Sequence, residues 1–273
     1  MPGDVTVVAG DARRMSTIPD GSVALVVTSP PYPMIPQWDG LFRQLGAAGF
    51  EGMHRVLDAV WVECHRVLLP GGVLCAVVGD ALRRVDGDFQ LWPNHARVLA
   101  GAWAAGFRPL PYVLWKKPTN KPNAFLGSGF LPPNAYVTLD CEFILLLRKG
   151  GPRAFPRRDA TRLRSRYSRA QRDRWFSQVW EGIRGAPQGP EDGRNASFPA
   201  EIPERLIRMF SVVGDTVLDP FAGDGTTLWA ARRLGRRAVG VEIDPIRARK
   251  LVERAREAPS ARRGGRRPPP SRG

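Results

Sequence analysis

The stretch that decides the fold of this 273-residue chain is Val217-Leu218-Asp219-Pro220-Phe221-Ala222-Gly223-Asp224-Gly225-Thr226-Thr227. Its first residues are apolar and end a strand predicted over 215–218, and its glycines predict a sharp turn into a helix over 226–234. The next strand, predicted over 238–243, carries the acid Glu242 near its end. Strand, glycine turn, helix, strand and acid in this order are typical of α/β folds that bind nucleosides.

The ligand that suits this loop is a nucleoside that also carries positive charge. Thr226 and Thr227 can cap the following helix, whose N-terminal amides attract a carboxylate. Glu242 can accept hydrogen bonds from both hydroxyls of a ribose. The spacing is neither that of a dinucleotide fingerprint nor that of a phosphate-binding loop. Because an acid at Asp219 suits an ammonium and a sulfonium better than a pyrophosphate, the loop predicts S-adenosylmethionine.

A second informative stretch is Thr28-Ser29-Pro30-Pro31-Tyr32, which directly follows an apolar strand predicted over 23–28. It should therefore lie at the carboxyl edge of the sheet, where α/β proteins bind ligands. Proline lacks an N–H, which leaves the carbonyls of Ser29 and Pro30 free as acceptors beside the Ser29 hydroxyl. Tyr32 can stack on a base. This set suits the exocyclic amino group of a planar base, and a rigid turn plugged by Tyr32 is the structural alternative.

The remaining pattern predicts an α/β core with an insertion. Further strands are expected over 5–9, 73–80, 111–115 and 142–147, and helices over 41–69, 95–105 and 202–210, with a short helix between 11 and 19 and a loop over 116–133. This order predicts a doubly wound, mostly parallel sheet. Residues 1–147 and 195–257 are its two halves, 148–194 a separate Arg-rich lobe, and 258–273 a disordered basic tail.

The net charge of +15 is concentrated in two segments. Residues 148–175 carry eleven Lys and Arg against two acids, and residues 247–273 carry ten against two. Since the rest of the chain is close to neutral, this local basicity predicts a polyanionic partner. For the tail, a simple compositional preference for Arg is the favoured explanation.

The cysteines exclude two classes of site. Cys64, Cys75 and Cys141 are widely spaced in apolar stretches, so they predict neither a disulfide framework nor a metal site.

No signal peptide opens the chain, and no apolar run approaches the length of a membrane span. We therefore expect a cytoplasmic protein with no metal and no membrane partner.

Together the two stretches resemble the amino-methylating DNA methyltransferases, in the permuted (beta) class in which the catalytic motif precedes the cofactor motif. Other matching motifs are Gly10-Asp11-Ala12, Leu69-Pro70-Gly71-Gly72, Trp115-Lys116-Lys117-Pro118, Glu142-Phe143-Ile144-Leu145, Ser197-Phe198-Pro199 and Val239-Gly240-Val241-Glu242-Ile243-Asp244-Pro245. The resemblance covers roughly residues 4–150 and 195–255. It implies a seven-stranded, Rossmann-like, circularly permuted sheet with a target-recognition lobe. One departure is Asn195-Ala196, where the family commonly has His-Pro.

The resemblance also implies a role for each motif residue. The position of Ser29 is Asp in most adenine-N6 enzymes of the family and Ser in most cytosine-N4 enzymes, so the chain resembles the cytosine-N4 branch. Ser29 and the Pro30 carbonyl would hold the amino group of a flipped cytosine and Tyr32 would stack on its ring, with Pro31 completing the catalytic turn. The residues expected around the cofactor are Asp11, Phe198, Pro199, Asp219, Pro220, Phe221, Gly223, Gly225, Thr226, Thr227, Glu242 and Ile243.

The expected reaction is an in-line attack of the amino nitrogen on the sulfonium methyl, which leaves S-adenosylhomocysteine and needs positioning and electrostatics rather than a covalent adduct. None of the cysteines follows a proline, as the nucleophile for methylation at carbon 5 of cytosine typically does. His54, His65 and His95 are candidate general bases, but their predicted helical setting favours packing roles.

The expected partner is double-stranded DNA, from which the target base must be flipped. The candidate DNA contacts are Lys116, Lys117, Arg157, Arg158, Arg162, Arg164, Arg166 and Arg169. Two other functions stay open: adenine-N6 methylation of DNA or amino methylation of RNA, and nucleic-acid binding by an inactive methyltransferase scaffold. A homodimer and a cognate restriction endonuclease acting on the same site are further partners to consider.

Overall fold

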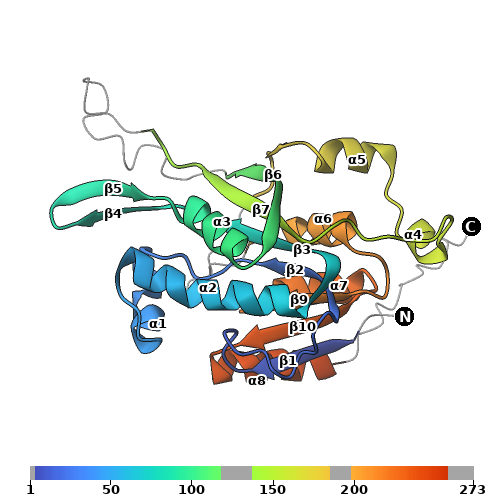
Figure 1. Ribbon diagram of the computed structural model, residues 1–273, viewed down its shortest axis with the longest axis horizontal. Helices are drawn as coiled ribbons and strands as arrows, with labels where there is room; N and C mark the ends of the chain where they lie inside the picture. The colour runs from blue at the N-terminus through green and yellow to red at the C-terminus, as the bar shows by residue number, and fades with distance from the viewer. Residues whose placement is uncertain (1–3, 118–136, 185–197, 258–273) are drawn as a thin grey trace, which may run out of the picture.

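A computed structural model describes residues 4–117, 137–184 and 198–257. Within these residues eight strands form one mixed sheet in the order β1-β10-β9-β2-β3-β7-β6-β8 (Figure 1). All neighbouring pairs are parallel except those that β7 makes with β3 and β6. The strands are β1 Val5–Ala9, β2 Val23–Thr28, β3 Leu68–Val78, β6 Phe107–Lys116, β7 Cys141–Lys149, β8 Val179–Trp180, β9 Thr216–Asp219 and β10 Arg237–Glu242. The predicted doubly wound, mostly parallel sheet is confirmed.

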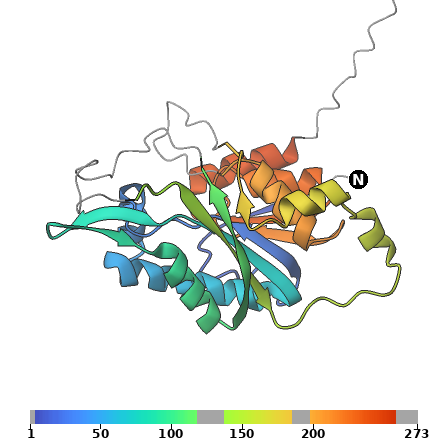
Figure 2. The same cartoon turned by 90° about the horizontal axis from the view of Figure 1, so that it is seen from above.

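Helices cover both faces of this sheet, which explains why its central strands are apolar throughout. In β3, Val73, Cys75 and Val77 pack on one face with α6 (Glu201–Phe210), α7 (Thr226–Arg233) and α8 (Pro245–Arg256). The alternating residues Leu74 and Ala76 pack on the other face with α2 (Gly49–Val67) and α3 (Asn94–Ala104). Figure 2 shows the two helical layers on either side of the sheet.

Two helix predictions are wrong. The single helix expected over 41–69 is broken into α1 Asp39–Gln44 and α2, because Gly46 and Gly49 adopt positive φ angles of 75° and 65° where the chain turns from one helix to the other. The short helix η1 Pro36–Trp38 precedes α1. The short helix expected between 11 and 19 is a series of turns. Helix α8, which was not predicted, begins at Pro245 after the Asp244 side chain caps the amides of Ile246 and Arg247.

Three strands, the pair β4 and β5 and the single strand β8, were also not predicted. The hairpin of β4 (Ala81–Val85) and β5 (Asp88–Trp92) was not expected, although Asp86-Gly87 at its tip has the positive φ angles of a tight hairpin turn. Strand β8 lies in the segment predicted to be a separate lobe, and it adds an eighth strand beside β6. The predicted tail 258–273 and most of the predicted loop 116–133 lie outside the described residues.

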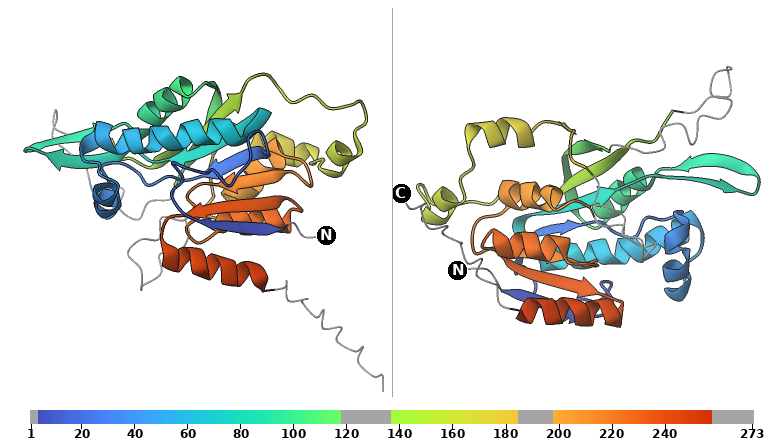
Figure 3. Two further views of the ribbon diagram at one scale, coloured as in Figure 1. Left: turned by 60° about the horizontal axis from the view of Figure 1, so that its bottom comes forward. Right: turned by 180° about the vertical axis from the view of Figure 1, so that it is seen from behind.

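The predicted lobe begins at the amino edge of the sheet. Because β7 is antiparallel to β3, it ends at that edge, where Arg148 pairs with Val73. The chain stays there through α4 (Ala160–Arg164): Arg153 forms an ion pair of 2.7 Å with Asp215, and Ser165 Oγ accepts a hydrogen bond from the Val213 amide. In the right panel of Figure 3, α4 and α1 lie at opposite ends of the molecule.

The end of the described part of this segment packs into the core. After α5 (Arg169–Trp175), Trp180 is 1% exposed and stacks under the Arg205 guanidinium of α6 at 4.8 Å. The indole of Trp115 in β6 donates a hydrogen bond to the Ile183 carbonyl. Residues 175–183 therefore join the core, with β8 as their strand in the sheet. The boundaries 148–194 of a target-recognition lobe stay a prediction.

Candidate active site

The two motifs that dominate the sequence lie on adjacent strands. Strands β2 and β9 are neighbours, so their carboxyl ends deliver Ser29 and the glycine loop to the same place. The buried Thr28 hydroxyl donates a 2.7 Å hydrogen bond to Asp219 Oδ1, and Thr227 Oγ1 donates to the Val27 carbonyl at 3.3 Å. A hydrogen bond to a charged group contributes about 1.5–3 kcal/mol. These bonds fasten the end of β2, which leads into the catalytic turn, to the glycine loop across 191 and 200 residues of sequence.

The glycine loop needs its glycines for both conformation and space. Gly223 and Gly225 have φ angles of 51° and 78°. A Cβ on Gly225 would lie 2.7 Å from the side chains of both Leu251 and Trp229. Gly225 itself is the N-cap of α7, and no side chain caps this helix, so the expected capping by Thr226 or Thr227 is wrong. The first amides of α7 therefore have no side-chain acceptor from the cap.

Asp219 and Glu242 are buried carboxylates at the ends of neighbouring strands. Asp219 also accepts a hydrogen bond from the Phe221 amide, and Glu242 accepts from the amides of Gly223 and Asp244 at 2.8 and 2.9 Å. Burial raises the pKa of Asp219 to about 6 and also raises the pKa of Glu242. Within the described residues no ion pair reaches either carboxylate. Both groups would gain from a positively charged or hydroxyl-bearing ligand.

Asp11, at the carboxyl edge after β1, is paired differently. Its carboxylate accepts hydrogen bonds from the Arg13 guanidinium at 2.6 and 2.9 Å and from the Arg13 amide. Burial alone would raise the pKa of Asp11, but these hydrogen bonds outweigh it and lower the pKa. Arg13 therefore keeps Asp11 ionised at the rim of the site. The sequence analysis did not predict this pair, although Arg13 lies only two residues after Asp11 in the sequence.

In the catalytic turn, the side chains of Ser29 and Tyr32 are hydrogen-bonded to each other. Ser29 Oγ donates to Tyr32 Oη at 2.9 Å, and Tyr32 Oη lies 3.1 Å from Glu142 Oε2 of β7. The ring of Tyr32 packs against Gly79, where a Cβ would come within 2.8 Å of it. Burial, together with the charge of Glu142, raises the pKa of Tyr32 well above 10, so the phenol stays protonated.

Side chains of α2 and α3 also hold the catalytic turn in place. Asn94, at the start of α3, donates to the carbonyls of Pro33 and Gly79, and its side-chain oxygen lies 3.0 Å from His54 Nε2. Burial lowers the pKa of His54 to about 4, so this histidine is neutral at physiological pH and can donate to Asn94. His95 pairs with Asp80 and stacks on Phe143. Neither these histidines nor His65 lines the cavity described next, which agrees with the packing roles expected for them.

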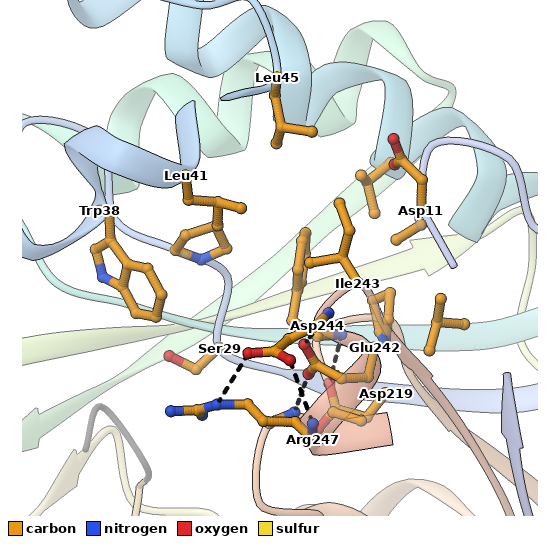
Figure 4. Close-up of a pocket in the computed structure, with 18 of the residues that line it drawn as sticks. Asp11, Ser29, Trp38, Leu41, Leu45, Asp219, Glu242, Ile243, Asp244 and Arg247 are labelled. Atoms are coloured by element: carbon orange, nitrogen blue, oxygen red, sulfur yellow. Dashed lines mark hydrogen bonds and ion pairs between the residues drawn. The ribbon is translucent and has the colours of Figure 1, made fainter. Parts of the chain in front are cut away.

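The motif residues meet in one cavity of about 600 Å³ at the carboxyl edge (Figure 4). Of the predicted catalytic residues, Ser29 and Pro31 line it and Pro30 and Tyr32 do not. Of the predicted cofactor residues, the wall contains Asp11, Phe198, Asp219, Pro220, Phe221, Gly223, Thr226, Glu242 and Ile243. Pro199, Gly225 and Thr227 do not line the cavity.

One wall of this cavity was missed by sequence reasoning. It is formed by the segment around α1 and by the facing side of α2, and Figure 4 shows Trp38, Leu41 and Leu45 opposite Asp219 and Glu242. The residues are Gln37, Trp38, Gly40, Leu41, Gln44, Leu45, Val56, Leu57 and Val60. Arg247 of α8, at 3.8–3.9 Å from Asp224 and Asp244, was missed as well. The sequence feature that could have predicted this wall is the pair of glycines 46 and 49, which interrupt the helix expected there.

The predicted DNA contacts fall into two groups. Arg157, Arg158, Arg162 and Arg164 are exposed at the amino edge, with Arg166 and Arg169 exposed on the return towards α5, so none of them lies at the cavity. Lys116 is the last residue of β6, at the carboxyl edge, and Lys117 follows it. Lys116 is exposed and 3.9 Å from Glu181, whereas Lys117 forms a 2.5 Å ion pair with Glu142.

The described residues contain no cluster of three or more His, Cys, Asp or Glu that could hold a metal ion. Among the helices of the described ranges, none is long and apolar enough to cross a bilayer. Both Cys64 and Cys75 are buried, and burial raises the pKa of each thiol, so neither is an activated nucleophile.

Comparison with known proteins agrees with this geometry. A family model described as DNA methylase (N6_N4_Mtase) matches residues 23–253. The Type II methyltransferase M.MjaI of Methanocaldococcus jannaschii is 52% identical over 262 residues, which cover 87% of this chain and 86% of the relative.

Solved structures show the same fold. TTHA0409 of Thermus thermophilus, complexed with S-adenosyl-L-methionine, has a TM-score of 0.74 and 40% identity over 92% of each chain. The cytosine-N4-specific PvuII DNA methyltransferase has a TM-score of 0.67 and 20% identity, over 91% of this chain and 85% of that one. With its motifs gathered in one cavity and the family model spanning both halves of the sheet, this chain belongs to the N6/N4 family of DNA methylases.

Proposed function

We propose that this protein transfers a methyl group from S-adenosylmethionine to the exocyclic N4 of a flipped cytosine in double-stranded DNA. The observation that carries the proposal is that Ser29 and Asp219 line the same cavity and are linked through Thr28. A turn suited to an amino group thus stands beside a loop suited to a cationic nucleoside. The serine supports cytosine over adenine through the family resemblance noted above.

The residues present fit S-adenosylmethionine. Asp219 and Glu242 offer buried carboxylates to its ammonium and ribose hydroxyls, and the uncapped start of α7 offers amides to its carboxylate. Phe221 and Ile243 provide apolar wall beside them. When bound, this cofactor supplies a methyl group that its sulfonium makes electrophilic. M.MjaI and TTHA0409 support the choice, because one is named a methyltransferase and the other binds this molecule.

The catalytic turn would act by positioning. The Ser29 hydroxyl accepts a hydrogen bond from the amino group and turns its lone pair towards the cofactor side of the cavity. The Pro30 carbonyl, which does not line the cavity, stays a predicted second acceptor. The apolar wall around Leu41 and Leu45 excludes water from the reacting atoms. The Tyr32 hydroxyl is hydrogen-bonded to Ser29 and to Glu142. Stacking of the Tyr32 ring on the base stays a prediction.

The direct test is the product. Purified protein should be incubated with duplex DNA and methyl-labelled S-adenosylmethionine, and the digested nucleosides separated by mass spectrometry. We expect N4-methyldeoxycytidine. N6-methyldeoxyadenosine as the sole product, or label in RNA only, would overturn the cytosine-DNA assignment, and absence of cofactor binding in calorimetry would favour an inactive nucleic-acid-binding scaffold.

Cofactor affinity should fall at acidic pH. The raised pKa of Asp219, about 6, means that this group is ionised above pH 7 and protonated progressively below 6. A cationic ligand binds the ionised form, so protons compete with it, and the affinity should weaken by up to about tenfold per pH unit below 6. Calorimetry between pH 5 and 8 measures this. The Asp219→Asn variant should show a much flatter profile, and an equally steep one would contradict the assignment.

The basic segment is proposed to bind DNA phosphates away from the target base, because its arginines lie at the amino edge. Replacing Arg162 and Arg164 with glutamine should weaken DNA binding without lowering turnover at saturating DNA. The slope of log affinity against log salt should decrease by about 0.9 for each phosphate that the variant no longer neutralises. An unchanged slope would remove these residues from the DNA interface.

The cytoplasmic location, a homodimer and a cognate restriction endonuclease stay predictions.

A further inference from the structure

A continuous chain of hydrogen bonds leads from the catalytic serine to a charged pair that the mechanism above does not use. Ser29 Oγ lies 2.9 Å from Tyr32 Oη, which lies 3.1 Å from Glu142 Oε2. The other carboxylate oxygen of Glu142 lies 2.5 Å from Lys117 Nζ. Three separate elements, the turn after β2, strand β7 and the end of β6, supply these groups.

The direction of the chain follows from the acceptors at its far end. An ionised Glu142 can only accept, and so can the Val77 carbonyl, which lies 3.2 Å from Tyr32 Oη. The single phenolic proton of Tyr32 is therefore directed to one of these two groups, and Tyr32 must accept from Ser29. Ser29 in turn donates its hydroxyl proton to Tyr32. The lone pairs of Ser29 Oγ can therefore accept a hydrogen bond from an N–H donor in the cavity.

Lys117 holds the carboxylate of Glu142 in place through an ion pair. The Glu142 side chain is only 12% exposed, and an unpaired buried carboxylate would be costly. The Lys117 ammonium compensates this charge and is itself held 5.2 Å from the centre of the Trp115 ring. Trp115 is 2% exposed and fixed by its bond to the Ile183 carbonyl.

We propose that Tyr32 and Glu142 form a relay that carries a proton away from the methylated amino group through Ser29, an inference that rests on the proposed amino methylation. As the new C–N bond forms, the amino nitrogen becomes positively charged and one of its N–H bonds breaks, with the electron pair returning to nitrogen. That proton passes to Ser29 Oγ, the Ser29 proton passes to Tyr32 Oη, and the Tyr32 proton passes to Glu142 Oε2. Glu142 becomes a neutral carboxylic acid and afterwards releases its proton to water.

In this relay Tyr32 and Glu142 are positioning residues, because they act on the base only through Ser29. Two conservative variants interrupt it. Tyr32→Phe removes the hydroxyl and keeps the ring that packs on Gly79, and Glu142→Gln keeps the shape and removes the proton acceptor. Glu181→Gln is the matched control, since this exposed carboxylate directly follows β8, the strand beside β6, and contacts only Lys116 among the ion pairs described.

Single-turnover methyl transfer at saturating DNA and cofactor separates the relay from a structural role. General acid–base groups typically contribute 10²–10⁴-fold, so we expect each variant to lose roughly 10²-fold in rate. The double variant should be about as slow as either single one, because the residues act as one unit. Cofactor affinity and DNA KM should stay at wild-type values, and Glu181→Gln should transfer methyl groups at the wild-type rate.

Three results would overturn the relay: a Glu142→Gln rate close to that of the wild type, additive losses in the double variant, or a loss of cofactor binding that parallels the loss of rate. If Glu142→Gln does not fold, Tyr32→Phe decides alone, since a wild-type rate in that variant excludes the relay. The base that is methylated, identified in the same reactions, reports on the proposed function separately. An adenine product would refute the cytosine assignment and leave the relay intact.

Discussion

Replacing Ser29 with alanine is expected to abolish detectable turnover while the protein still binds its cofactor. The Ser29 hydroxyl is the polar side chain of the catalytic turn that lines the cavity, and its lone pairs face any amino group placed there. Removing one preorganised hydrogen-bonding group from a transition state typically lowers kcat by about 10²–10³-fold. Asp219, Glu242 and the start of α7 are unchanged in this variant, so the cofactor loop should keep its ligand. Single-turnover kinetics and calorimetry on the same preparation measure the two effects.

A matched control for this variant is Ser16→Ala, an exposed serine after β1 that is outside the cavity. It should leave both quantities at wild-type values. A Ser29→Ala enzyme that loses cofactor affinity as strongly as turnover would show that the catalytic turn and the cofactor loop are not separate parts of the site.

Replacing Asp219 with asparagine should have the opposite pattern, a large loss of cofactor affinity. Asparagine can still accept from Thr28 and from the Phe221 amide, so the loop keeps its geometry and loses only the charge. Removing one partner of a buried charge pair costs roughly 2–5 kcal/mol, which corresponds to about 30- to 5000-fold in Kd. Titration calorimetry with S-adenosylmethionine measures this loss, and saturating cofactor should restore part of the rate.

The control for this second variant is Asp173→Asn, an exposed carboxylate on α5 paired with Arg172. Its cofactor affinity should equal that of the wild type. Unchanged affinity in Asp219→Asn would show that this carboxylate does not face the cationic part of the cofactor, and the reason for assigning the loop to S-adenosylmethionine would disappear.

The parts of the fold that the sequence predicted are those with strong local signals. The strands over 5–9 and 23–28 were placed within the observed bounds, because buried parallel strands are short apolar runs with few alternatives. Glu242 was placed correctly at the end of its strand. The adjacency of β2 and β9 was not predicted, because the two segments are 188 residues apart between Thr28 and Thr216 and periodicity does not pair distant strands.

The parts that the sequence missed depend on contacts between distant segments. Trp38 and Leu41 line the cavity from a segment that glycines 46 and 49 separate from α2, and an apolar spacing of three and four residues does not reveal such a break. The position of the arginines at the amino edge follows from the antiparallel direction of β7, which no local pattern in the sequence reveals. Glu142 was recognised as part of a motif, but its contact with Tyr32 required the sheet to be assembled.

The most direct test of the proposed function is base-resolution sequencing with modification detection on DNA from cells that express either the wild-type protein or Ser29→Ala. We predict N4-methylcytosine at one recurring sequence in the first DNA and none at that sequence in the second. N6-methyladenine in place of N4-methylcytosine, or the same modification with both proteins, would contradict the assignment of Ser29 as the residue that holds the cytosine amino group.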